Sequence, residues 1–298
     1  MIVVIAMLDK DHPPNHSFVD GFLVDCVARV PGIKVRLCTS YGDSPKIYRY
    51  RGAASLAVMR PRKGIGRIVN FVIALILLKR QIARERKRNR RVVLFVRNDP
   101  LYLLACSLVR PSVSALVFQS SFPHESTNPR SIRQWVARWL YRMASPRVDS
   151  VLAVSPRGLE RVRKIFATSK NGAVIPLLSD LPRVKGVKSR DVVTFVYVGT
   201  HDPGRQLDVV LKGIAGAVGM GVKARFVFVG GSDNQIESLC NLDYVEDLVN
   251  TGYLQFISKV PRQMIPAILA EADVGLPLIP PSRICREASP TKLAEYMG

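Results

Sequence analysis

Two carboxylates stand eight positions apart near the end of the sequence, at Glu287 and Glu295, and a Ser-Pro-Thr turn lies between them. Proline suits a first helical turn, because its φ is fixed and its missing N–H leaves no bond unmade there. We therefore expect a helix that starts at Thr291 and carries Lys292, Leu293 and Glu295. Free N–H groups at a helix start bind anions. The pattern suits a sugar–phosphate–ribose ligand, although two solvated surface carboxylates would show the same spacing.

A second pattern that could do chemistry lies within residues 195–213, which read as a strand, a glycine-containing turn and a helix. Gly199 would let the backbone turn sharply after the strand, and Thr200 follows it. Arg205 stands near the start of the next helix, where a cation could reach a diphosphate lying over the turn. An ordinary strand–helix loop with a solvated arginine fits the same residues.

The elements that must position these residues alternate regularly along the chain. Short apolar runs rich in β-branched residues alternate with helical patterns, which indicates an α/β fold with parallel sheets covered on both faces. The strand-like runs are 2–8, 34–39, 92–96, 115–119, 151–155, 173–177, 192–199, 225–230, 254–258 and 274–278. The helical patterns are 18–29, 68–88, 131–144, 156–166, 207–218, 234–239 and 261–271.

The chain is long enough for two such domains. Residues 182–190 are polar and basic and predict a linker between an N-terminal domain, 1–181, and a C-terminal domain, 191–298. We expect two doubly wound, Rossmann-like domains that face each other across a cleft, because ligands collect at the carboxyl ends of parallel strands.

The net charge of +21 is distributed unevenly. Residues 1–190 contain 35 Lys and Arg against 11 Asp and Glu, whereas residues 191–298 contain 9 against 12. An excess of this size on one side predicts an anionic partner for the N-terminal half, either nucleic acid or an acidic membrane surface. The five cysteines are scattered and form no CxxC pair, which favours reduced thiols in the cytoplasm.

A basic run follows a mostly apolar run of ten residues, 69–78, which is too short to span a bilayer. Between residues 79 and 91 there are eight basic residues and one acid, Glu85. This combination fits a helix that lies on an anionic membrane, and Trp135 and Trp139 among arginines fit the same interface. A core helix with a solvated charged end is the alternative. The candidate membrane-binding residues are Lys79, Arg80, Arg84, Arg86, Lys87 and Arg88.

The Val-Gly…Pro-Gly-Arg-Gln-Leu-Asp-Val-Val-Leu stretch and the terminal Glu-x7-Glu with Ser-Pro-Thr-Lys-Leu-Ala-Glu-Tyr-Met resemble the retaining GT-B glycosyltransferases of family 4. That family uses nucleotide-diphosphate sugars, and the resemblance covers about residues 192–298. It implies that Glu287 contacts hydroxyls of the transferred sugar, that Glu295 binds the ribose and that Arg205 grips the diphosphate.

The resemblance also assigns Gly199, Thr200, Thr291 and Leu293 to the nucleotide-sugar site. Family members usually carry an arginine where this sequence has Thr200. One phosphate-binding cation is therefore missing or supplied elsewhere, with Lys292 as the candidate.

The N-terminal half resembles the family more loosely. The segment 118–125 follows a predicted strand and ends in His124 and Glu125, and a histidine from this region often binds the donor sugar in the family. His124 is the catalytic candidate, with Ser120 or Ser121 as alternatives for that place and a loop histidine without a role as another reading. Residues 97–100, Arg-Asn-Asp-Pro, either face the cleft or only shape a turn.

The sequence thus predicts a retaining glycosyltransferase with an oxocarbenium-like transition state, acting in polysaccharide or glycolipid assembly. Its partners would be a nucleotide sugar, a lipid-linked or saccharide acceptor and the anionic inner face of the cell membrane, with no nucleic acid and no metal or other cofactor. A nucleic-acid-binding protein and an inactive scaffold of the same fold are the alternatives. Family members continue beyond the final helix, so a truncated chain with a shortened second domain is expected.

Overall fold

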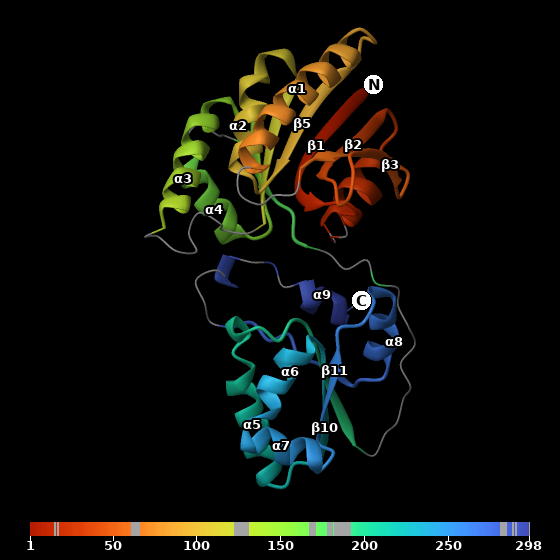
Figure 1. Cartoon of the computed structure of the whole chain (residues 1–298), viewed down its shortest axis with the longest axis vertical. Helices are drawn as coiled ribbons and strands as arrows, with labels where there is room; N and C mark the ends of the chain where they lie inside the picture. The colour runs from red at the N-terminus through yellow and green to blue at the C-terminus, as the bar shows by residue number, and fades with distance from the viewer. Residues whose placement is uncertain are drawn as a thin grey trace. The chain divides into compact units, whose positions relative to one another are not determined.

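The computed structural model describes residues 1–14, 16, 18–60, 66–121, 131–166, 171–177, 181, 192–280, 285–287, 289 and 291–297. The chain forms two compact units, whose elements are labelled in Figure 1. The first unit holds Met1–Leu178 and Arg283–Ser289, and the second holds Ser179–Ser282 and Pro290–Gly298. The expected linker, 182–190, lies outside the described residues.

The first unit is built on a sheet of eight strands in the order β3-β4-β2-β1-β5-β6-β7-β8. Every neighbouring pair is parallel except β3 with β4. Chain order reverses between β1 and β5, so the topological switch point of a doubly wound sheet lies there. The strands are β1 (Ile2–Asp11), β2 (Ile33–Ser40), β3 (Lys46–Tyr50), β4 (Ala53–Met59), β5 (Arg91–Arg97), β6 (Ala115–Ser120), β7 (Ser150–Ala153) and β8 (Asn171–Val174).

Helices cover both faces of this sheet, as the apolar runs predicted. Val3, Ile5 and Met7 of β1 point into one core, which is closed by α1 (Gly66–Arg86), α2 (Pro100–Leu108), α3 (Ile132–Ala144) and α4 (Pro156–Ile165). Val4, Ala6 and Leu8 point into the other core, which is closed by a π-helical segment, Phe18–Cys26. In Figure 1, α1, α2 and α3 lie side by side on one face.

The hairpin of β3 and β4 is absent from the sequence prediction. Its two-residue turn, Arg51-Gly52, has φ of 48° and 89°, which matches the twist of a hairpin. Such turns usually carry asparagine or aspartate before the glycine, and arginine is uncommon in the left-handed region. Only Gly52 therefore marked this turn in the sequence. The antiparallel strand β3 forms the edge of the sheet beyond β4.

A buried ion cluster fixes the basic end of α1. The Glu85 side chain is fully buried, and its two oxygens lie 2.6 Å from Nη2 of Arg36 and 3.0 Å from Nη1 of Arg90. Burial alone would raise the pKa of Glu85, but the two arginines outweigh it and hold that pKa below its ordinary value. The acid within the basic run is therefore a structural residue, and Arg90 faces inward to meet it.

The second unit contains a parallel sheet in the order β11-β10-β9-β12. Its strands are β9 (Val193–Val198), β10 (Ala224–Gly231), β11 (Leu254–Ser258) and β12 (Val274–Gly275). One face packs on α5 (Leu207–Gly219), α6 (Asp233–Cys240) and α7 (Asp243–Asn250). The other packs on α8 (Ile265–Ala270) and on α9 (Thr291–Met297) through Tyr296. The helix predicted to begin at Thr291 is confirmed.

Strand β12 is shorter than the predicted run 274–278. It pairs with β9 only through Val274 and Gly275. Pro277 follows shortly after and has no N–H to donate, which ends the ladder. The ring of Tyr296 lies against Gly275, where an added Cβ would come within 2.5 Å of ring atoms. Order in this sheet also reverses beside β9, between β9 and β12.

Candidate functional site

Polar side chains meet at the carboxyl ends of β1, β5 and β6 in the first unit. Arg97 is 3% exposed and forms an ion pair with Asp9. The second amino group of Arg97 donates to Oγ of Ser121 at 2.9 Å and lies 3.0 Å from Nε2 of His16. Asn98 Nδ2 donates to Asp9 at 3.0 Å and to Ser121 at 2.8 Å. These contacts fix the side chains at the switch point of the sheet.

A cavity of about 710 Å³ opens beside this cluster and is lined only by residues of the first unit. Asp9, Asn98 and Asp99 form part of its wall, and the first turns of α1 and α2 with most of the length of α3 form the rest. Asp99 caps α2, because its Oδ1 accepts from the N–H groups of Leu101 and Tyr102, and Pro100 begins the helix. The segment 97–100 therefore both shapes the backbone and lines a cavity.

Glu287 is held by the first unit. It ends a 3₁₀ turn, Cys285–Glu287, and its carboxylate forms an ion pair with Arg161 of α4. Arg161 also donates from Nη2 to Oγ of Ser120 at 2.8 Å, at the end of β6. The Oγ of Ser155 donates to the carbonyl of Glu287 at 2.7 Å. Glu287 is thus tied to the carboxyl end of β6, and Arg161 is a contact that the sequence did not reveal.

His124 and Glu125, the other candidates after β6, lie outside the described residues. Ser120 and Ser121, the alternatives for that place, lie at and just after the end of β6: Ser120 bonds Arg161, and Ser121 bonds Arg97 and Asn98. The catalytic assignment of His124 stays a prediction.

The loop after β9 in the second unit is packed closely around Gly199. The Tyr197 hydroxyl donates to the carbonyl of Thr200 at 2.9 Å, and a Cβ at position 199 would lie 2.5 Å from that hydroxyl. The φ of Gly199 is not positive, so lack of space, not a strained turn, requires glycine there. The Thr200 hydroxyl bonds Asp202. Arg205 ends a short 3₁₀ turn, Pro203–Arg205, and is half-buried.

The helix α9 meets the same sheet edge. The hydroxyl of Tyr296 accepts a hydrogen bond of 2.9 Å from the N–H of Val198, the last residue of β9. Burial raises the pKa of Tyr296 to about 12, so the phenol stays protonated. The Glu295 side chain is 5% exposed and lies 2.6 Å from Nζ of Lys292 and 3.8 Å from Arg262. In the second unit, α9 and the loop that carries Arg205 therefore meet beside Gly199, whereas Glu287, the other carboxylate of the terminal pattern, belongs to the first unit.

The remaining predicted residues of α9 differ in exposure. Thr291 opens the helix and is half-buried, whereas the Leu293 side chain is exposed. Contact between these two residues and a nucleotide sugar stays a prediction.

His201 is a buried histidine in this loop that was not among the predicted site residues. It is 4% exposed, and neither ring nitrogen has a hydrogen-bond partner among the described residues. Its ring lies over Gly231, where a Cβ would come within 1.8 Å of Nδ1. Burial lowers the pKa of His201 to about 4, against the opposite pull of Asp202, so the ring is neutral at pH 7. The signal for such a packing role was Gly230-Gly231 at the end of β10.

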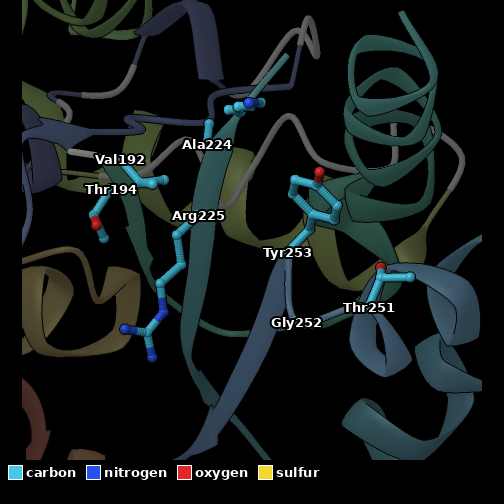
Figure 2. A pocket seen from close by; sticks show the side chains of 8 residues that line it. Val192, Thr194, Ala224, Arg225, Thr251, Gly252 and Tyr253 are labelled. Atoms are coloured by element: carbon cyan, nitrogen blue, oxygen red, sulfur yellow. The ribbon is translucent and has the colours of Figure 1, made fainter. Parts of the chain in front are cut away.

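A separate hollow of about 520 Å³ lies at the opposite edge of this sheet, where its strands begin. Figure 2 shows Arg225 and Tyr253 among the side chains around it. Ligands of doubly wound sheets bind at the carboxyl ends of strands, so this hollow does not coincide with the candidate site.

The six basic residues proposed for membrane binding on and after α1 are all exposed, and none forms an ion pair with a described residue. No helix in the described part of the chain is both long enough and apolar enough to cross a bilayer. Within the same residues, no three His, Cys, Asp or Glu side chains gather as metal ligands would. That the reaction needs no metal stays a prediction.

No protein-family model matches this sequence, and no curated protein sequence does so either. Solved structures do match. A sucrose-phosphate synthase from Thermosynechococcus elongatus is 12% identical, with a TM-score of 0.66, over 93% of this chain and 76% of that one. The apo form of the lipopolysaccharide outer core galactosyltransferase WaaB is 10% identical, with a TM-score of 0.64, over 92% and 73%.

The UDP-GlcNAc 2-epimerase from Methanocaldococcus jannaschii is also similar, at 10% identity and a TM-score of 0.59 over 92% of this chain and 78% of that one. Its presence among glycosyltransferases shows that one architecture serves more than one reaction. Sequence identities this low support a shared fold only. Two parallel sheets, each with a switch point, and likeness over more than nine-tenths of the chain together show that the protein has the GT-B fold.

Proposed function

We propose that the protein is a retaining glycosyltransferase that moves a sugar from a nucleotide-diphosphate donor to an acceptor. The observation that carries the proposal is the hydrogen bond between Tyr296 and Val198, which brings α9 to the glycine loop. Through it Lys292 and Glu295 lie at the sheet edge from which the Arg205 loop departs. Doubly wound folds bind nucleotides at this edge.

In this proposal the two cations act on the diphosphate. Arg205 and Lys292 offset the charge that grows on the leaving group as the bond to the sugar breaks, and fixed cations do this without reorganisation. Lys292 already lies 2.6 Å from Glu295, so a bound ribose would share the carboxylate with it. Glu287 would hold hydroxyls of the transferred sugar, with His124 as its catalytic partner. The proposed reaction uses no metal ion bound by the protein.

Nucleotide binding tests the donor site. We expect UDP or GDP to bind the full chain in calorimetry, and the double variant Arg205→Gln, Lys292→Gln to bind at least tenfold more weakly. Charge-assisted contacts to phosphate contribute about 1.5–3 kcal/mol each. Arg225→Gln is the matched control, because Arg225 is exposed at the opposite edge of the same sheet. If neither nucleotide binds, the enzyme proposal fails.

We further propose that the protein works on the cytoplasmic face of the cell membrane, in polysaccharide or glycolipid assembly. Support comes from α1, where Ile68, Val72 and Ile76 are exposed along one stripe that continues into the basic residues. An exposed apolar stripe with a basic continuation suits the interface of an anionic bilayer. Each basic side chain near such a surface contributes roughly 1 kcal/mol.

Vesicle binding tests this location. Replacing Arg84, Arg86 and Arg88 by glutamine should weaken binding to phosphatidylserine-containing vesicles about 100-fold, since three charges contribute roughly 3 kcal/mol. A matched triple change, Lys212, Lys223 and Lys259 to glutamine, removes three exposed charges from the second unit and should have little effect. Equal losses in both variants, or preferential binding of the wild-type chain to RNA over vesicles, would contradict the membrane role.

A further inference from the structure

The cavity beside the switch point of the first unit combines two kinds of surface. Its inner wall is polar, with Asp9, Asn98 and Asp99 at the ends of β1 and β5. Asn98 and Asp99 are each 4% exposed, so their positions are set by the fold. Its outer wall includes apolar side chains of α1 and α3, namely Ile68, Ile132 and Val136.

Those apolar side chains reach solvent instead of closing a core. Ile68 is 67% exposed, Ile132 is 80% exposed and Val136 is 39% exposed, although all three line the cavity. Large apolar side chains gathered in one exposed patch usually mark a binding surface. The mouth of the cavity therefore carries apolar side chains beside the exposed Arg67 and Arg133, while its inner wall is hydrogen-bonding.

The apolar surface continues from the mouth along α3. Trp135 is 63% exposed, Trp139 is 50% exposed and Met143 is 50% exposed, at helical spacings that place them on one stripe with Ile132. An elongated hydrocarbon could leave the cavity along this stripe. Ring edges of exposed tryptophans suit the boundary between a polar phase and hydrocarbon.

The charges on the inner wall decide what polar group fits. Asp9 and Asp99 are carboxylates, and two cations, Arg67 and Arg133, also line the cavity, with Arg67 3.7 Å from Asp99. The lining thus holds as many carboxylates as cations, and Asp9 and Asp99 are already paired with Arg97 and Arg67, so the cavity offers an anion such as phosphate no net attraction. Hydroxyl groups, in contrast, donate to carboxylate oxygens. A volume of about 710 Å³ is of the size that holds a small-molecule ligand.

We propose that this cavity binds an amphiphile with an uncharged, hydroxylated head and a hydrocarbon chain, with the head against Asp9 and Asn98 and the chain over Ile132 and the α3 stripe. That this amphiphile is the acceptor rests on the proposed glycosyl transfer, and it makes the acceptor a glycolipid instead of a free saccharide. The binding itself does not depend on the transfer reaction.

Tryptophan fluorescence measures this binding directly, because the only two tryptophans of the chain, Trp135 and Trp139, lie on α3. The probe is octyl β-glucoside below its micelle concentration, added to the full chain without nucleotide. We expect it to bind at least tenfold more tightly than either glucose or octanol, and more tightly than octyl phosphate. Binding no tighter than octanol would overturn the polar half of the proposal, and tighter binding of octyl phosphate would overturn the uncharged head.

Two variants locate the site. Ile132→Ser, at the mouth, should weaken octyl glucoside binding about tenfold, whereas Met143→Ser, on the same stripe but outside the cavity, should change it less than twofold. Both side chains are half or more exposed, so neither change threatens folding. Equal effects would mean adsorption to the helix surface and would overturn the site. If octyl glucoside binds but UDP and GDP do not, the amphiphile site is supported and the proposed glycosyl transfer is contradicted. If UDP or GDP binds but octyl glucoside does not, the glycosyl transfer is supported and the amphiphile site is contradicted.

Discussion

Replacing Glu287 by glutamine should lower the turnover of sugar transfer about 100-fold while leaving nucleotide binding nearly unchanged. The substitution keeps the shape of the side chain but removes the charge that pairs with Arg161. Loss of one preorganised polar contact in an active site typically costs 10²–10³ in turnover. The measurement is release of labelled sugar from the nucleotide sugar whose base binds in calorimetry.

The control for this variant is Glu160→Gln, one position before Arg161 on α4. Glu160 is exposed and pairs only with Lys164 on its own helix among the described residues. It should transfer sugar at the wild-type rate. A second variant, Arg161→Lys, keeps a cation but loses the fork that joins Glu287 to Ser120, and should lower turnover without abolishing it. If Glu287→Gln keeps full activity and an unchanged melting temperature, Glu287 has no role in sugar transfer.

Replacing Glu85 by glutamine should lower the free energy of unfolding of the first unit by about 3 kcal/mol. The change leaves Arg36 and Arg90 beside a buried neutral amide, and breaking a buried ion pair by removing one partner costs about 3–5 kcal/mol. Both tryptophans belong to the first unit, so their fluorescence in urea follows the unfolding of that unit alone. Glu237→Gln, at an exposed glutamate of the second unit, should leave this transition in place.

Acid offers an independent check on the same cluster. The pKa of Glu85 is lower in the folded chain than its ordinary value, so its stabilisation is complete above the unfolded pKa and is lost as pH falls through the folded one. Wild type should therefore lose stability in acid faster than Glu85→Gln does. Parallel losses would show that Glu85 carries no net charge in the folded chain.

The sequence predicted those parts of the fold in which local pattern and burial agree. The apolar runs of β1, β5 and β10 are buried on both faces, and each was found within a few residues. β3 was missed because its burial is partial and its side chains are mostly polar or aromatic. α2 was missed because residues 97–100 were interpreted as facing the cleft or as shaping a turn, although aspartate followed by proline is equally the start of a helix.

Some parts of the candidate site were likewise predictable from the sequence and others were not. Lys292 and Glu295 were predictable, because three positions on one short helix bring them together. Arg161 was not, because it meets Glu287 across 126 positions of sequence and no local pattern marks a long-range ion pair. Glu85 shows the converse error: the sequence placed it in a basic run interpreted as membrane-facing or solvated, while the fold buries it in an ion cluster.

The assignment of residues 283–289 to the first unit has a consequence for synthesis on the ribosome. Most of that unit is complete at residue 178, but Glu287 and Ser289, which bond Ser155, Arg161 and Leu177, emerge roughly a hundred residues later. At 5–20 residues per second, the delay is about 5–20 s. During that interval Arg161 and the amide of Leu177 in the nascent first unit lack these late partners, and a chaperone has time to bind there.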